Sequence, residues 1–261
     1  MKIVVCVKYV PDASADRTFG SDNTVDRVGV DGVLSELDEY AVEEALKIRD
    51  SGVDDVEIVV VTMGPGEARA AILKSLQMGA DAGVHVKDDA IHGSDAIATS
   101  LVLANAIERQ GPDIVLCGMA STDGSMSVVP AMLAERLSLP QVTFASEVKV
   151  DGSTVQVRRD GDSATETIEA STPLLISVTD QANEPRYPSF KGIMAAKKKP
   201  VEELTIADLG IDANDVGTAA AWTEVTGVEA RPPRTAGTIV SDTDGSGADQ
   251  LVEFLAGQKF I

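Results

Sequence analysis

The segment Val56-Glu-Ile-Val-Val-Val-Thr62 is followed by Gly64-Pro65-Gly66 and then by a helical pattern over residues 67–78. A continuous run of Val and Ile is typical of a strand whose two faces are both covered. Gly and Pro interrupt the chain directly after this run. The segment therefore predicts one complete strand–turn–helix unit, which is the repeating unit of α/β proteins.

The same unit recurs on both sides of this segment. Strands are predicted at residues 3–7, 56–62, 84–86 and 114–117, and helices at residues 39–49, 67–78, 94–109 and 127–137. The polar, Gly- and Asp-rich residues 11–33 are predicted to form an excursion or hairpin. Four strand–helix units indicate an α/β fold with a doubly wound parallel sheet and right-handed crossovers.

The pattern changes after Pro140. Strands are predicted at residues 142–150, 154–159, 165–170 and 174–179 without intervening helices, so we expect an antiparallel extension of the sheet. From residue 201 onward the chain has little core-like periodicity, apart from a short helical pattern at residues 250–255. This last segment is either disordered or an arm that packs on a partner, and its apolar islands favour a long C-terminal arm.

The composition excludes several classes of protein. The chain has 261 residues with 22 Lys and Arg against 42 Asp and Glu, so its net charge is −20. This charge argues against a general nucleic-acid binder and against adhesion to anionic membranes. No apolar run approaches the ~18 residues of a transmembrane helix. The residues that follow Met1 are predicted to be a strand and not a signal peptide.

Cysteine and histidine are scarce. Cys6 and Cys117 lie within apolar runs, which predicts free thiols in strands. With His85 and His92 they show no clustered spacing, so we expect no structural metal site. The two histidines are predicted to be structural or exposed, and no Ser/His/Asp set is evident. We therefore expect a reduced, cytoplasmic protein, and no residue set suggests an acid–base catalyst.

Ligands of a doubly wound sheet bind beyond the carboxyl ends of its strands. The candidate binding residues fall in four segments at that edge: Cys6, Val7 and Lys8; Ser35, Glu36, Leu37 and Asp38; Met63 and Gly64; and Gly118, Asp123, Gly124, Ser125, Met126, Ser127, Val128 and Val129.

The last of these segments is small, hydroxyl-rich and free of Lys and Arg, and it joins a strand to a helix. Unpaired amides at a helix N-terminus can hold a phosphate, and the composition favours a monophosphate. Alternatively, Ser125 or Ser127 only caps the helix. Gly64 permits close approach of an adenine or ribose, although a tight strand–helix turn is the favoured explanation of this segment taken alone. The dinucleotide fingerprint and the Walker A motif are absent.

A second informative segment spans residues 183–200. Between Arg186 and Lys199 it holds five cations and no acid, a reversal of sign on this chain. Phe190 is predicted to lie in a loop between Pro188 and Gly192. An exposed aromatic ringed by cations would dock an acidic partner, whereas the alternative is a basic helix end with Phe190 folded inward. The candidate docking residues are Arg186, Tyr187, Phe190, Lys191, Ile193, Met194 and Lys197.

These residues resemble one known family. The segments that carry the resemblance are residues 2–8, Glu39-Tyr-Ala-Val-Glu-Glu-Ala45, Met63-Gly64-Pro65, Met78-Gly-Ala-Asp81, Pro140-Gln-Val-Thr-Phe-Ala-Ser146, Asn183-Glu-Pro-Arg-Tyr187, Ile193-Met-Ala-Ala-Lys-Lys-Lys199 and Pro232-Pro-Arg-Thr-Ala-Gly237. They occur in order over essentially the whole chain. The chain resembles the β subunit of electron transfer flavoproteins.

The resemblance implies a fold, cofactors and partners. It implies an adenine nucleotide α-hydrolase-like fold with AMP bound in this chain, and FAD shared with or held by an α subunit in a heterodimer. Such a carrier accepts electrons from acyl-CoA dehydrogenases and related enzymes of fatty acid β-oxidation. It passes them through a quinone oxidoreductase to the respiratory chain, and it has no catalysis of its own.

The resemblance also assigns residues. It places the AMP contacts at Cys6, residues 35–38, Met63 and residues 123–134. The chain departs from the family's pattern in three places: Ser35-Glu36-Leu37 replaces its Asn-Pro-Phe, Pro130 replaces a Gly, and Phe190 replaces a Leu that anchors the partner dehydrogenase. Phe190 preserves an apolar plug and is expected to alter the choice of partner.

The expected organisation has three parts. Residues 1–182 would form the nucleotide-binding domain with its antiparallel extension, residues 183–200 the partner-recognition loop, and residues 201–261 an arm on the α subunit. Two alternatives stay open. One is a bifurcating relative with a second FAD in place of AMP, and the other is a stand-alone nucleotide-binding regulator.

Overall fold

The computed structural model describes residues 1–237 and 239–261 of the chain. These residues separate into two compact units, residues 1–226 and residues 227–261. The larger unit is built around a nine-stranded sheet with the order β11-β5-β4-β1-β6-β10-β7-β8-β9.

The parallel part of the sheet contains the strands expected from the Val- and Ile-rich runs. Its members are β1 (Lys2–Cys6), β4 (Glu57–Met63), β5 (Ala82–Val86), β6 (Ile114–Gly118), β10 (Leu174–Val178) and β11 (Val201–Leu204), together with the first residues of β7. Because both faces are covered, every residue of β6 and β10 is buried.

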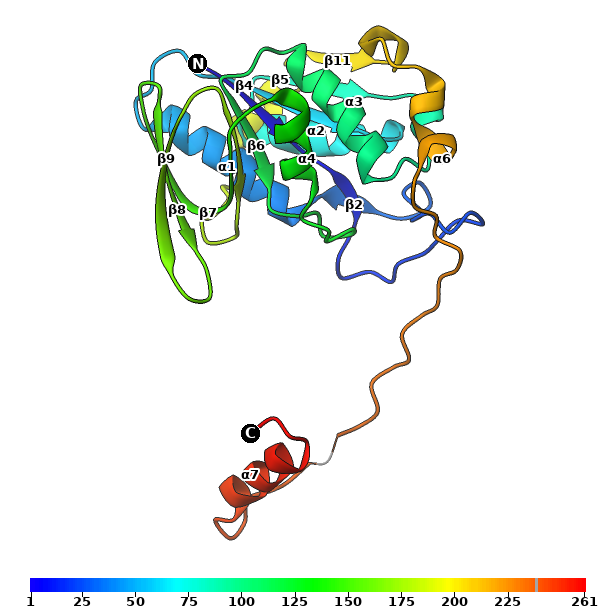
Figure 1. Ribbon diagram of the computed structural model, residues 1–261, viewed down its shortest axis with the longest axis vertical. Coiled ribbons are helices and arrows are strands. Elements are labelled where there is room, and N and C mark those ends of the chain that lie inside the picture. The colour runs from blue at the N-terminus through cyan, green and yellow to red at the C-terminus, as the bar shows by residue number, and fades with distance from the viewer. Residues whose placement is uncertain (238) are drawn as a thin grey trace. The chain divides into compact units, whose positions relative to one another are not determined.

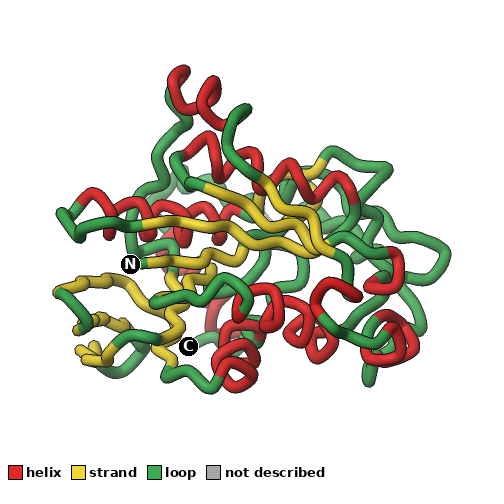
Figure 2. The backbone as a smooth tube through the Cα atoms, turned by 90° about the horizontal axis from the view of Figure 1, so that it is seen from above, coloured by secondary structure: helices red, strands yellow, loops and turns green. Residues whose placement is uncertain are grey.

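Helices cover both faces of this sheet, as Figure 2 shows in the view from above. The helices α1 (Glu36–Asp50) and α2 (Arg69–Met78) pack in one hydrophobic core, while α3 (Ala96–Glu108) and α4 (Val129–Leu137) pack in the other. The doubly wound α/β fold predicted from the sequence is thus confirmed. Within the described residues, none of the helices has the length and apolarity needed to cross a membrane.

The prediction of four strands in the antiparallel extension is wrong for one of them, the strand expected at residues 174–179. β10 pairs parallel with both β6 and β7, so it belongs to the central sheet. Only β7 (Gln141–Asp151), β8 (Thr154–Asp160) and β9 (Thr165–Ser171) form the antiparallel part, seen at the left of Figure 1. β10 returns to the core because it is apolar on both faces, whereas β8 and β9 alternate with exposed residues.

The segment that begins at residue 201 is also more ordered than its periodicity suggests. β11 pairs parallel with β5 and completes the edge of the sheet, and Leu204, Ile206 and Val216 are buried in the second core. A strand of four residues is too short to show a period, which is why the sequence pattern missed it. The turns at Ala207–Leu209 and Ala213–Asp215 and the short helix α6 (Gly217–Ala220) follow.

The smaller unit, residues 227–261, contains one helix, α7 (Gly247–Gly257). Leu251, Val252 and Phe254 of this helix are all more than half exposed. Its apolar side chains therefore lack a core within the described residues of this unit.

Two smaller predictions about the larger unit can be compared with the structure. The excursion after β1 is closed by an antiparallel pair, β2 (Tyr9–Pro11) and β3 (Gly32–Leu34), so the expected hairpin is confirmed. Residues 190–196, expected as a loop, form the helix α5 (Phe190–Ala196).

The close packing of α2 on β5 is testable at Gly83. A Cβ on this residue would lie 2.3 Å from Cγ2 of Ile72. We expect Gly83→Ala to lower the free energy of unfolding by about 1–3 kcal/mol, because overpacking forces a shift of helix or strand. The matched control is Gly161→Ala, where the nearest atom lies at 3.4 Å. Urea denaturation measures both, and equal stability of the two variants would contradict the prediction.

Candidate functional site

The strand order reverses beside β1. The chain runs outward from β1 through β4 and β5, and then returns to the other side of β1 at β6. A crevice forms at such a reversal, at the carboxyl ends of the strands. These ends are Cys6, Met63 and Gly118. The four segments predicted from the sequence therefore follow or flank one edge of the sheet.

A buried ion-pair network connects these segments. The side chain of Asp123 is 1% exposed. Lys8 Nζ donates to Oδ1 of Asp123 at 2.8 Å, and Arg27 pairs with Oδ2 of the same carboxylate. Burial alone would raise the pKa of Asp123, but the charges of Lys8 and Arg27 outweigh burial and lower it. Asp123 is thus ionised, and its carboxylate fastens the loop after β6 (residues 119–128) to β1 and to the excursion.

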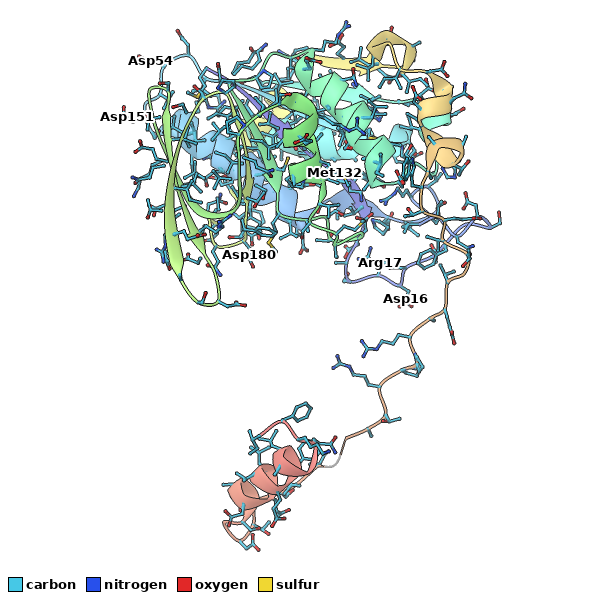
Figure 3. All side chains as sticks on the ribbon, viewed as in Figure 1. Asp16, Arg17, Asp54, Met132, Asp151 and Asp180 are labelled. Carbon is cyan, nitrogen blue, oxygen red and sulfur yellow. The ribbon has the colours of Figure 1, made fainter. Side chains whose placement is uncertain are left out.

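Arg17 and Arg27 were missed by the sequence analysis. Arg27 NH1 also donates to the carbonyl of Tyr9 at 2.9 Å. Arg17, labelled in Figure 3 on the excursion after β2, donates from NH2 to the carbonyl of Thr122 at 2.8 Å. Its NH1 is buried and has no hydrogen-bond partner among the described residues. A signal existed, because these arginines are the only cations between Lys8 and Lys47.

The loop then enters α4 without a capping side chain. The N-cap residue is Val128, and within the described part of the chain no side chain caps the backbone N–H groups at the start of the helix. The capping alternative for Ser125 and Ser127 is therefore wrong. Both serines have left-handed backbone angles, with φ of 52° and 57°, a conformation that costs L-residues about 1–2 kcal/mol each. An uncapped helix start beside strained serines is an arrangement suited to an anion.

Asp38, near the start of α1, binds the backbone of Lys8 after β1 and lies against Gly118 at the end of β6. Its Oδ2 accepts from the backbone N–H of Lys8 at 2.8 Å. A Cβ on Gly118 would lie 2.6 Å from Asp38 Oδ1 and 2.7 Å from the carbonyl oxygen of Leu37, so only glycine fits there. Burial raises the pKa of Asp38 to about 7, although backbone N–H groups and the charge of Lys8 oppose this shift.

Ser35 belongs to the same junction. It is fully buried, and its Oγ accepts from the backbone N–H of Thr122 at 3.3 Å. The residues of the segment 35–38 therefore have different roles. Ser35 and Asp38 are buried and bind the loop after β6 and the residue after β1, whereas Glu36 is exposed and Leu37 is half-buried.

The end of β4 supplies a glycine at the same edge. Gly64 has a φ of 153°, within the range that favours glycine, and its carbonyl oxygen lies 3.1 Å from His85 Nε2. His85 is buried, and burial lowers its pKa so that the ring is neutral. His85 therefore lies inside the domain as a neutral ring, and its Nδ1 has no hydrogen-bond partner among the described residues.

The two cysteines lie at the ends of adjacent strands. Cys6 is half-buried, Cys117 is buried, and both are free thiols. A hydrogen bond with Cys6 and then burial raise the pKa of the Cys117 thiol, so it is protonated. Among the described residues there is no group of three or more His, Cys, Asp or Glu side chains that could hold a metal ion.

The second candidate surface is the segment around α5. Ser189 caps this helix, and its Oγ accepts from the N–H of Gly192 at 3.0 Å. Phe190 occupies the first helical position and is 81% exposed, while Tyr187 is 92% exposed. The inward alternative for Phe190 is therefore wrong, and the aromatic ring projects from a helix start and not from a loop.

Cations fasten both ends of this segment. Arg186 donates from Nε and NH2 to Glu43 of α1, each at 2.8 Å, and from NH2 to Asp50 at 2.9 Å. The bonds to Glu43 raise the pKa of Arg186 further, so it is a fixed cation. Lys199 Nζ donates to the carbonyls of Leu76 and Ala80 at the end of α2. Two of the five cations thus hold the segment in place.

The docking candidates between these ends are exposed. Lys191, Met194 and Lys197 are exposed, as is Ile193 by a narrow margin. No ion pair among the described residues includes Lys191 or Lys197. They therefore lie where an approaching protein can reach them.

The shifted pKa of Asp38 predicts an unusual dependence of stability on pH. The unfolded chain releases the Asp38 proton near its ordinary pKa, whereas the folded chain releases it near pH 7. The contribution of Asp38 to the free energy of unfolding should therefore fall between about pH 4 and pH 7, by a few kcal/mol. The measurement is the difference in unfolding free energy between the wild type and Asp38→Asn over this range.

Asp54→Asn removes an exposed carboxylate, labelled in Figure 3, and is the control for the loss of one negative charge. A wild-type minus Asp38→Asn difference that is flat with pH would contradict the raised pKa.

Comparisons of the sequence with known proteins all identify the same family. A sequence profile described as "Electron transfer flavoprotein domain" matches residues 22–209. The "Electron transfer flavoprotein subunit beta" of Mycobacterium tuberculosis is 46% identical over 264 residues, covering 99% of both chains. Proteins of the same name from Megasphaera elsdenii and Thermoanaerobacterium thermosaccharolyticum are 34% and 36% identical, covering 100% of each chain. The chain belongs to the electron transfer flavoprotein family, among the β subunits, and has a role in electron transfer.

Proposed function

We propose that this chain is the β subunit of a heterodimeric electron transfer flavoprotein, binds AMP at the carboxyl edge of its sheet and carries no catalytic group. The observation that supports the nucleotide most directly is the uncapped start of α4 beside Ser125 and Ser127. FAD, held with the α subunit, would take up and release the electrons. The residues of this chain would bind, orient and dock.

The residues present fit a mononucleotide. The phosphate would lie at the backbone N–H groups of Val129 and Ala131 at the start of α4, since Pro130 between them has none, and at the hydroxyls of Ser125 and Ser127. The adenosine would lie against Met63 and Gly64. A glycine at position 64 lets a flat ring approach the backbone. Arg17 NH1, buried without a partner among the described residues, is a donor available to one anion.

AMP is favoured over a second FAD in this site. Lys8 and Arg27 are engaged by Asp123, so their charges are already compensated. A diphosphate carries more charge than a monophosphate and needs more donors. One spare arginine nitrogen and one uncapped helix start suit the smaller anion.

We further propose two protein interfaces. Phe190, with Tyr187 and the free cations Lys191 and Lys197, would dock acyl-CoA dehydrogenases and the quinone oxidoreductase that passes electrons to the respiratory chain. The apolar side chains of α7 would pack on the α subunit, which argues against a stand-alone regulator. The chain would act in the cytoplasm.

The nucleotide content of the heterodimer tests the site. Co-expression with the α subunit, purification and acid release should give one FAD and one AMP per heterodimer by chromatography. Two FAD and no AMP would contradict the proposal and support the bifurcating alternative. A monomer that binds neither flavin nor an α subunit would support the stand-alone regulator.

The docking anchor is tested by truncating Phe190. Because a buried aromatic anchor is commonly worth 2 kcal/mol or more, Phe190→Ala should lower kcat/KM for electron transfer from an acyl-CoA dehydrogenase by about 30-fold. Flavin content should not change. Phe190→Leu retains an apolar plug and should retain most of the rate. Unchanged transfer in Phe190→Ala would show that Phe190 is not an anchor.

A further inference from the structure

We propose that the groove between α2 and the end of α5 receives an apolar side chain from an acidic segment of the electron-donating dehydrogenase. This inference rests on the proposed function, since it adds a second contact to the docking surface around Phe190. Here the partner inserts a side chain into this chain, which is the reverse of the contact made by Phe190.

The groove is formed by two helices that are packed together. Its volume is about 250 Å³, and its lining residues are Arg69, Ala70, Ile72, Leu73, Leu76, Ala196, Lys197, Lys199 and Val201. Ile72 and Leu76 are buried at its base, and Leu73 is 42% exposed. Lys199 is held against the end of α2 by its bonds to Leu76 and Ala80, so its aliphatic stem forms a fixed wall.

The size and chemistry of the groove suggest a protein side chain. Clefts for small ligands usually measure about 300–1,000 Å³ and contain several convergent polar groups. This groove is smaller and is lined mainly by aliphatic atoms. Such a groove suits one Leu, Met or Phe side chain, which is how partner hot spots occupy pockets.

The charged residues around the groove indicate which residues should flank the inserted side chain in the partner. Neither α2 nor the segment from Arg186 to Lys199 contains an acid, although the whole chain has a net charge of −20. Arg69 and Lys197 are exposed on the two sides of the groove, and no ion pair among the described residues includes them. Cations left free beside an apolar groove favour a partner segment that carries Asp or Glu.

The groove is also continuous with the docking candidates already described. α5 carries Phe190 at its start and Ala196 of the groove at its end. Ile193 and Met194, 37% and 50% exposed, lie between them. One partner surface would therefore contact Phe190 and the groove together, and both contacts would contribute to the same binding free energy.

The test uses the complete heterodimer and a purified acyl-CoA dehydrogenase as electron donor. Leu73→Ser removes an apolar wall, and Arg69→Glu reverses a flanking charge. We expect each to raise the KM for the heterodimer about 5- to 30-fold, the range of a moderate hot spot. The kcat at saturation should change less than twofold. Arg69→Glu should also weaken the dependence of KM on salt.

Matched controls separate this effect from general damage. Ile97→Ser changes a similarly exposed aliphatic residue, 40% exposed on α3, and Lys149→Glu reverses an exposed charge on β7. Neither should raise KM. If Leu73→Ser and Arg69→Glu match these controls while Phe190→Ala impairs transfer, the groove proposal fails and the proposed function stands.

Two other outcomes also overturn the groove proposal. If the variants no longer purify with the α subunit, the groove is a subunit interface. If they slow only the oxidation of the flavin by the quinone oxidoreductase, the groove serves that partner. A wild-type heterodimer that accepts no electrons from any acyl-CoA dehydrogenase would instead refute the proposed function itself.

Discussion

The carboxyl edge of the parallel sheet depends on one buried carboxylate. Asp123 lies almost fully buried between Lys8 and Arg27, which come from two other segments of the chain. An unpaired buried charge would cost several kcal/mol, so the carboxylate and its two cations must be assembled together. Their assembly holds the excursion, the end of β1 and the loop after β6 in one arrangement. The loop before α4 can keep two left-handed serines because it is fixed in this way.

The segment around α5 is fastened in a similar manner. Arg186 binds Glu43 and Asp50 of α1 at one end of the segment, and Lys199 binds the end of α2 at the other. The ion pairs of Arg186 and the hydrogen bond of Lys199 fix the two ends of the segment, and Phe190 is exposed at the start of α5 between them. A rigidly presented side chain loses less conformational entropy on binding, which would favour the docking role proposed for Phe190.

Residue patterns predicted most of the fold and the general place of the site. The Val- and Ile-rich strands, the Gly64-Pro65 break and the Gly118 loop were sufficient to position the binding edge. β10 was misplaced because partner choice is not visible in a strand's own sequence, and β11 was missed because a strand of four residues is too short to show a period. Periodicity shows whether a strand is buried on one face or two, but hydrogen-bond pairing depends on residues far away in the chain.

What the sequence by itself determined is therefore local: the alternation of strands and helices, the excess of acid, the basic segment around Phe190 and the family resemblance. Only the tertiary structure decided which charges are free. The sequence predicts Lys8 as a binding residue and Arg186 as a docking residue, yet Lys8 pairs with Asp123 of the loop after β6 and Arg186 pairs with Glu43 of α1. Arg27, which is absent from those predictions, pairs with the same Asp123. The physical reason is that a charge acts on whatever lies within a few ångströms, and only folding sets those distances.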